Sequence, residues 1–106
     1  MAKLKLVANP TFKAKVGIPT AGGDPVEVEF TFKHRTKAAL DQWMKDMTGK
    51  GNAEYILGFV EAWELEDALT KENIETLLEN YMGASQAIID VYFDELYPAK
   101  LGNSAR

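Results

Sequence analysis

The chain has no cysteine and a single histidine among its 106 residues. The lack of cysteine excludes disulfides, thiolate nucleophiles and thiolate metal sites, and it fits a reducing compartment. His34, the one imidazole, lies among Lys33, Arg35 and Lys37. Their positive charges disfavour a protonated imidazole, and no neighbouring carboxylate in the sequence can orient the ring as a base. We therefore interpret His34 as a surface or strand-end residue.

Long apolar runs are absent as well. No run approaches the roughly 20 residues with which a helix spans a bilayer. Residues 1–6 alternate apolar and polar side chains, whereas a secretory signal has a continuous apolar core. We therefore expect a soluble, intracellular protein with no membrane partner.

The usual patterns of phosphate and metal sites are also missing. Gly22 and Gly23 are followed by a strand-like segment, which is not the order found in a phosphate-binding loop. Asp90 and Asp94 share a helix face, but a calcium loop needs alternating oxygen ligands around a central glycine. We therefore predict a protein that is not an enzyme and that binds no cofactor or metal.

Basic residues are scarce in the second half of the chain. Residues 1–50 contain nine Lys and Arg against five Asp and Glu, whereas residues 51–106 contain three against eleven. Such polarity has no obvious use in catalysis, but it suits a protein that docks head to tail on copies of itself. We predict weak self-association between basic and acidic side chains of two copies, namely Lys33, Arg35 and Lys37 with Glu72, Glu75 and Glu79. The acidic segment 64–67 is an alternative partner for the same basic side chains.

The composition is that of an ordinary globular protein, with 46% hydrophobic and 26% charged residues. We expect a single domain over residues 1–99 and a frayed tail over residues 100–106. The predicted fold class is α+β, with an N-terminal antiparallel β-hairpin or small sheet packed against about four C-terminal helices.

Two segments near the N-terminus alternate apolar and polar side chains, as half-buried strands do. They cover residues 12–18 and 26–33, and the prolines and glycines of residues 19–25 predict the loop between them. A turn centred near Gly22 predicts inner-face pairs of Phe12 with Phe32, Ala14 with Phe30 and Val16 with Val28, and an outer-face pair of Lys15 with Glu29. Leu4 and Leu6 are candidates for a third strand.

From Thr36 onward the apolar side chains recur at helical spacing. Thr36, Asn52 and Thr70 are the predicted N-caps of three helices. The apolar stripe of the second helix is predicted to run from Tyr55 to Trp63. The residues expected between the sheet and the helices are Phe30, Phe59 and Trp63.

A fourth helix is predicted from about Ala84 to Tyr97. Its apolar side chains cover roughly two-thirds of the circumference and leave Asp90 and Asp94 as a narrow polar wedge, although one core contact needs a stripe only about 100° wide. The excess is covered either by neighbouring helices of the same fold or by another chain. For the second case, we predict that the partner-binding residues are Ile89, Phe93 and Tyr97.

Four segments of the chain are weak indicators of a family when each is taken alone. Their common order and spacing are more specific. They are residues 9–14, the hairpin with its basic end at residues 21–37, the step Trp63-Glu64-Leu65, and residues 72–84. In these segments the chain resembles the short tail assembly chaperones of long-tailed bacteriophages, and the resemblance covers almost the whole chain. The family often has proline after the tyrosine of the third helix, where this chain has Met82, so continuity of the third and fourth helices stays open.

The resemblance implies a small, non-enzymatic α+β protein in the cytoplasm of the host bacterium. Proteins of this family coat the long tape measure protein, keep its hydrophobic helices from aggregating and deliver it to the polymerising tail tube. They are lost before the virion is mature. The implied partners are the tape measure protein, the tail tube protein and a longer form of the chaperone made by ribosomal frameshifting.

Two other functions stay open at this point. The chain could be an acidic adaptor or antitoxin-like module that neutralises a basic partner. It could also be a small RNA-binding protein that uses the basic cluster of residues 33–37. The formal net charge of −4 and the acidic second half disfavour RNA binding, because phosphate contacts need an excess of positive charge.

Overall fold

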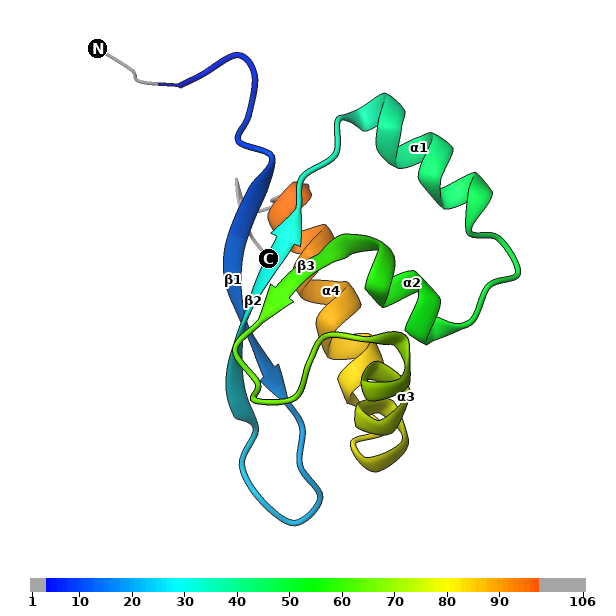
Figure 1. The fold of residues 1–106 in the computed structure, drawn as a ribbon. Helices are drawn as coiled ribbons and strands as arrows, with labels where there is room; N and C mark the ends of the chain where they lie inside the picture. Colours follow the sequence, from blue (N-terminus) through cyan, green and yellow to red (C-terminus); the bar gives the residue numbers. More distant parts are fainter. Residues whose placement is uncertain (1–3, 98–106) are drawn as a thin grey trace, which may run out of the picture.

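An antiparallel sheet and four helices make up the protein in a computed structural model, which describes residues 4–97 (Figure 1). The strands are β1 (Thr11–Ile18), β2 (Val26–Lys33) and β3 (Val60–Trp63), in the order β1-β2-β3. The helices are α1 (Lys37–Asp46), α2 (Asn52–Phe59), α3 (Lys71–Asn80) and α4 (Ala84–Leu96). The fold class is therefore α+β, as predicted. The predicted frayed tail, residues 100–106, lies outside the described residues.

The β1–β2 hairpin has the predicted register. Phe12 is opposite Phe32, and the inner-face and outer-face pairs that follow it are also those expected from the alternation. Gly22 adopts a φ of 77° in the connecting loop, a conformation that side chains with a Cβ rarely adopt. One inner-face residue differs from the pattern, because Val26 at the loop end of β2 is exposed.

The third strand is not where we expected it. Leu4 and Leu6 do not pair with the sheet and are exposed, so this part of the prediction was wrong. The third strand is β3, which pairs antiparallel with β2 through Phe30 opposite Trp63. The register shifts at Thr31 and Phe32, as it does at a β-bulge, which inserts an extra residue and bends the strand.

Two of the three predicted helix caps are confirmed. The Thr36 hydroxyl accepts a hydrogen bond from the Ala39 amide, and the Thr70 hydroxyl accepts one from the Asn73 amide, each at 3.1 Å. The prediction for the second helix was wrong, because its N-cap is Gly51 and it makes no side-chain capping bond. The same helix ends at Phe59, and the chain continues directly as β3.

Helices α3 and α4 are separate. Tyr81 caps the C-terminus of α3, and α4 begins two residues beyond Met82. Gly83 lies between the helices and against the hairpin loop, where an added Cβ would be 3.0 Å from Pro19 Cγ. The hairpin loop therefore packs on the turn between the last two helices.

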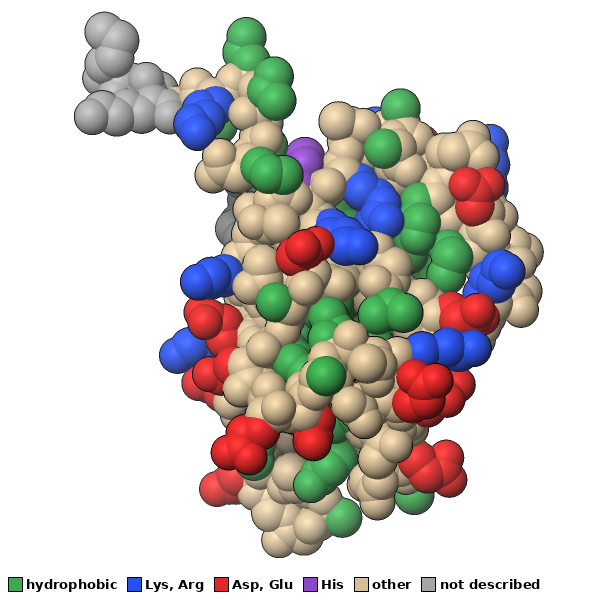
Figure 2. All heavy atoms as spheres, in the orientation of Figure 1, with side chains coloured by type: hydrophobic (Ala, Val, Ile, Leu, Met, Phe, Trp, Pro, Cys, Tyr) green, Lys and Arg blue, Asp and Glu red, His purple; other side chains and the backbone are tan. Residues whose placement is uncertain are grey.

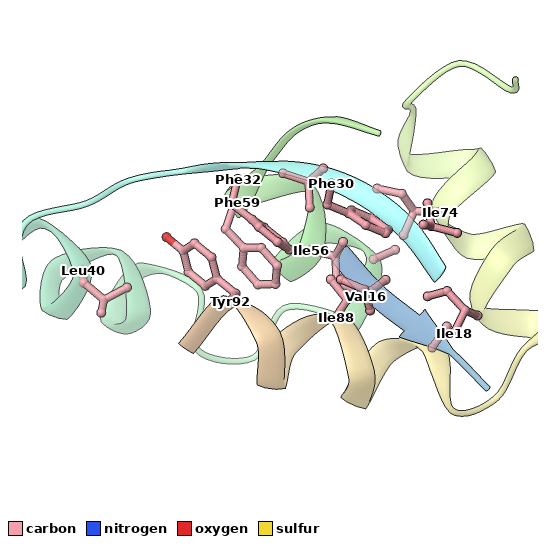
Figure 3. Packing of buried hydrophobic residues seen from close by; sticks show 14 residues of the cluster. Val16, Ile18, Phe30, Phe32, Leu40, Ile56, Phe59, Ile74, Ile88 and Tyr92 are labelled. Atoms are coloured by element: carbon pink, nitrogen blue, oxygen red, sulfur yellow. The ribbon is translucent and has the colours of Figure 1, made fainter. Parts of the chain in front are cut away.

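The core lies between the sheet and helices α2 and α4, and Figure 3 shows its aromatic side chains converging from three elements. We call Phe12, Phe32, Phe59 and Tyr92 the aromatic cluster. Phe59 and Tyr92 stack with ring centroids 4.2 Å apart and planes 8° apart, and both are fully buried, as is Phe32. Helices α2 and α4 therefore pack against the sheet through aromatic rings, each of which buries a large apolar area.

Trp63 lies at the margin of this core. Phe30 and Phe59 are fully buried as expected, but Trp63 is half-buried. Its ring meets Phe30 edge-on at 6.2 Å. The indole Nε1 donates a hydrogen bond to the Asp67 carbonyl at 2.7 Å, so Trp63 joins β3 to the segment that leads into α3.

Candidate functional site

Arg35, from the centre of the basic cluster, is engaged inside the chain. Its guanidinium donates hydrogen bonds to the Gly58 carbonyl at 2.7 Å and to the Tyr92 hydroxyl at 3.3 Å. The Arg35 Cζ also lies 4.4 Å from the centroid of the Trp43 ring, within the range of a cation–π interaction. We call Arg35, Trp43, Gly58 and Tyr92 the Arg35 junction. It connects the segment after β2 to α1, α2 and α4.

The lack of a side chain at Gly58 is what allows Trp43 to lie there. A Cβ on Gly58 would be 2.9 Å from two atoms of the Trp43 ring, closer than carbon atoms normally approach. Trp43 also packs 4.8 Å from the ring of Tyr55 and edge-on to Phe59. Helix α1 is thus fixed to α2 through one large ring.

Tyr92 provides the polar end of the aromatic cluster. Its hydroxyl donates a hydrogen bond to the Lys33 carbonyl at 2.9 Å and accepts the one from Arg35. Burial raises the pKa of Tyr92, and the hydrogen bond and charge of Arg35 oppose that rise. Tyr92 is therefore a neutral phenol at physiological pH, with both roles of its hydroxyl satisfied.

The three predicted basic residues have different surroundings. Lys37 is exposed on the first turn of α1, Lys33 is half-buried at the end of β2, and Arg35 belongs to the junction. His34 lies beside them at the end of β2, and its backbone amide donates to the Pro10 carbonyl at 2.8 Å. These side chains therefore offer less free positive charge than the sequence suggests.

The predicted acidic residues lie together on one helix. Glu72, Glu75 and Glu79 are all exposed on α3. Glu75 and Glu79 also line a shallow groove between α2 and α3. At one end of it the Lys71 ammonium is 3.8 Å from the Glu54 carboxylate. Figure 2 shows acidic and no basic side chains at the lower end of the visible face, so the charge asymmetry of the sequence is also present in space.

Helix α4 is covered mostly by its own fold. Ala84, Ile88 and Tyr92 are fully buried, whereas the predicted polar wedge of Asp90 and Asp94 is exposed. The predicted partner-binding residues form one row at four-residue spacing along the edge of that wedge. Along this row Ile89 and Phe93 are half-buried and packed on the core, and Tyr97 is 51% exposed.

The described residues contain little that could carry out chemistry. Within residues 4–97 no group of three His, Asp or Glu side chains could hold a metal ion, and the Tyr92 phenol is the one buried side chain that carries a polar group. The helices of the same region are too short or too polar to cross a membrane. What the surface offers is a set of charged and apolar patches, which are features of protein contacts.

The Arg35 junction is the part of the molecule that sequence reasoning missed. The partners of Arg35 are 23 and 57 residues further along the chain, beyond the reach of any local pattern. A weak signal was present, because a glycine inside an otherwise apolar helix often marks a close approach by another group.

Comparison with known proteins gives one assignment. Searches of curated proteins and of solved structures returned no match. The family model described as phage tail assembly chaperone matches residues 1–103, which include both ends of the β1–β2 hairpin, the Arg35 junction and all four helices. The chain therefore belongs to the phage tail assembly chaperone family.

Proposed function

We propose that this protein binds the tape measure protein of a phage or prophage during tail assembly. It keeps the hydrophobic helices of this client soluble in the cytoplasm of the host bacterium and delivers the client to the growing tail tube. The tail tube protein and a longer frameshifted form of the chaperone are further proposed partners, and the protein is absent from the mature virion. The observation that carries the proposal is the family match over residues 1–103.

The client site that we propose is the row formed by Ile89 and Phe93 on α4 and by Tyr97 at the C-cap of that helix. These residues follow one another at four-residue spacing, and Tyr97 at the C-terminal end is the most exposed of the three. An amphipathic helix of the client can pack along such a row, as helices do in hydrophobic grooves. Each contact is small, so the binding strength comes from many copies along one long client.

Co-expression with the tape measure protein tests this site. Tyr97→Ser removes the most exposed ring of the row, and we expect it to lower the soluble, co-purifying fraction of the client several-fold. Phe93→Ser with Tyr97→Ser should abolish co-purification. The matched control is Met82→Ser, which removes another exposed apolar side chain outside α4 and should leave the client soluble.

The outcomes test the proposed function and the proposed client site separately. Thermal melts of each variant show whether the fold survives, which matters for the half-buried Phe93. If the folded Tyr97 variant solubilises the client as well as the parent, the client site lies elsewhere. If the parent chain itself leaves the client as insoluble as it is alone, the proposed function is wrong.

We also propose that copies associate through their charges on the client. Lys33 and Lys37 are the basic side chains available for this contact, with Arg35 contributing charge from within the junction. Glu72, Glu75 and Glu79 of the next copy would face them. Exposed ion pairs contribute only about 0.2–1 kcal/mol each and are screened by salt, so this contact is weak by itself.

A further inference from the structure

Residues 4–10, which we call the arm, carry apolar side chains that nothing in the described chain covers. Leu4, Leu6 and Val7 are 87%, 100% and 83% exposed. Figure 1 shows the arm continuing from the start of β1 and bending away from the body of the protein, and Figure 2 shows its apolar side chains standing clear of the body. Lys5 Nζ donates to Asn9 Oδ1 at 3.1 Å within the arm, and the Pro10 carbonyl at its base accepts from the His34 amide. The alternation of Leu4, Lys5 and Leu6 suits an extended strand that has no partner here.

A second surface has the complementary character. A hollow of about 410 Å³ lies between the end of β3 and α3. Trp63, Leu65, Leu77 and Tyr81 provide the apolar part of its lining, and Asp67, Asn73, Thr76 and Asn80 provide the polar part. Glu66, next to Asp67 in the chain, is exposed, whereas the Glu64 carboxylate accepts a hydrogen bond from the Glu29 amide at 2.6 Å. The apolar part of the lining is therefore accompanied by the carboxylates of Asp67 and Glu66.

We propose that the arm of one copy of this chain docks in the hollow of a second copy. In an extended arm Leu4 and Leu6 point to one side and meet the apolar lining, while Lys5 starts on the opposite side and its long side chain reaches back to the carboxylates beside the hollow. Burying two fully exposed leucines supplies the driving force, and the opposite charges set the direction of the arm. This contact involves the chaperone alone and does not depend on the client proposed above.

The arrangement of the sheet makes the contact head to tail. The arm extends from β1, and the hollow lies beside β3, which is the opposite edge of the sheet. In Figure 1 the arm also points away from α3. The arm of a chain therefore does not reach its own hollow, and each copy keeps one arm and one hollow. A heterologous contact of this kind extends into a ring or an open array.

Two variants that each lose one side of the contact provide the test. Leu4→Ser with Leu6→Ser removes the arm's apolar surface and leaves the hollow intact. Tyr81→Arg fills the hollow and places a positive charge near Lys5, and it leaves the arm intact. Val26→Ser is the matched control, because it removes an exposed apolar side chain at the far end of β2.

Analytical ultracentrifugation over a concentration series gives the result. We expect the parent chain and the Val26 control to form assemblies that grow with concentration, and each of the two variants to weaken self-association at least about tenfold. An equimolar mixture of the two variants has one competent arm and one competent hollow, so it should form a complex of two chains and no larger species. Thermal melts of both variants should match the parent.

Other outcomes would overturn the proposal. A parent chain that is monomeric at every concentration has no such contact. An arm variant that assembles like the parent shows that the arm is not involved. If both variants are folded monomers and their mixture also stays monomeric, the arm and the hollow do not bind each other.

Discussion

The aromatic cluster and helix α1 are held in place by different interactions. Phe32, Phe59 and Tyr92 are fully buried and stack ring on ring between the sheet and α4. Helix α1, in contrast, buries only Leu40 and half of Trp43, and its other residues are exposed. Its second attachment is the Arg35 guanidinium over the Trp43 ring. One region is stabilised by apolar area, whereas the other depends on a few specific contacts.

This difference predicts how the loss of one contact destabilises each region. Loss of a ring from the aromatic cluster removes packing that the sheet and two helices share, so the whole domain should lose stability. Loss of a contact at the Arg35 junction should release α1 first and leave the sheet folded, because local openings follow the number and kind of local contacts. Five measurements, four on variants and one on pH dependence, can sharpen or break this distinction.

Phe59→Ala should have the largest effect. A fully buried phenylalanine replaced by alanine lowers the free energy of unfolding by about 3–5 kcal/mol, a large part of the stability of a small domain. Chemical denaturation followed by circular dichroism measures the change. Met82→Ala, at a 90% exposed position, is the control and should stay within about 0.5 kcal/mol of the parent. An equally small change at Phe59 would mean that the cluster does not hold the domain together.

Tyr92→Phe should have an intermediate effect. The ring and its packing stay, but the Lys33 carbonyl loses its donor and Arg35 loses an acceptor. We expect a loss of about 1–3 kcal/mol in the free energy of unfolding. Tyr97→Phe, at a half-exposed position, should change little. If both tyrosine variants behave alike, the Tyr92 hydroxyl contributes nothing to the fold.

The parent chain and its Tyr92→Phe variant can also be compared as a function of pH. Burial raises the pKa of Tyr92 in the folded state above the usual 10.0. Above pH 10 the unfolded chain loses this proton first, so the stabilising contribution is complete below pH 10 and falls as the pH rises toward the folded-state pKa. The parent should therefore lose more stability than Tyr92→Phe between about pH 9 and pH 11. Parallel melting curves across this range would contradict the assignment.

Gly58→Ala should have a smaller and local effect. The new methyl group would meet the Trp43 ring at 2.9 Å, although alanine also favours the helix by up to about 1 kcal/mol. We expect faster amide exchange in α1 and unchanged exchange in β1 and β2. Gly51→Ala is the control, since a Cβ there meets nothing within 4 Å. Adding Trp43→Leu to Gly58→Ala should relieve the clash. Amide exchange that becomes faster to the same extent in α1, β1 and β2 would argue against a separately held α1.

Lys37→Glu should have the smallest effect, and only on association. Lys37 is exposed and lies outside the Arg35 junction, so the fold should be unaffected. Reversal of one exposed charge should weaken charge-driven self-association by a few tenths to about 1 kcal/mol at low salt and by less at high salt. Sedimentation at two ionic strengths measures this, with Lys45→Glu on the same helix as the control. Identical behaviour of both variants would exclude Lys37 from the contact.

The sequence was sufficient to predict the hairpin and its register because two independent patterns agreed there. The apolar alternation and the opposite charges of Lys15 and Glu29 require the same register. The second helix failed for the opposite reason. Phe59, Val60 and Trp63 fit one helical stripe, yet Val60–Trp63 is a strand, because an open edge of β2 is available in the folded chain. That edge is a property of the tertiary structure, which local periodicity does not contain.

The candidate sites were predictable only in part. Exposure of Glu72, Glu75 and Glu79 and the polar wedge of α4 follow from helix periodicity, and the structure has both. Arg35 was read as surface charge because its neighbours in the sequence are polar and basic. Its contacts with Gly58 and Tyr92 arise only after α2 and α4 have been brought beside the end of β2. Leu4 and Leu6 have strand-like alternation but no edge in their own chain to pair with.

The position of α4 also sets the order in which the chain can fold during synthesis. The β1–β2 hairpin is made first and is local in sequence, so it can form early. Its inner face, however, is covered by α4, whose Tyr92 contacts Phe12 and Phe32 across about 60 to 80 residues of chain. The nascent hairpin therefore exposes an apolar sheet until α4 has left the ribosome, and closure of the core on α4 is the late step. During that interval the chaperone itself has the aggregation-prone surface of an incompletely folded protein.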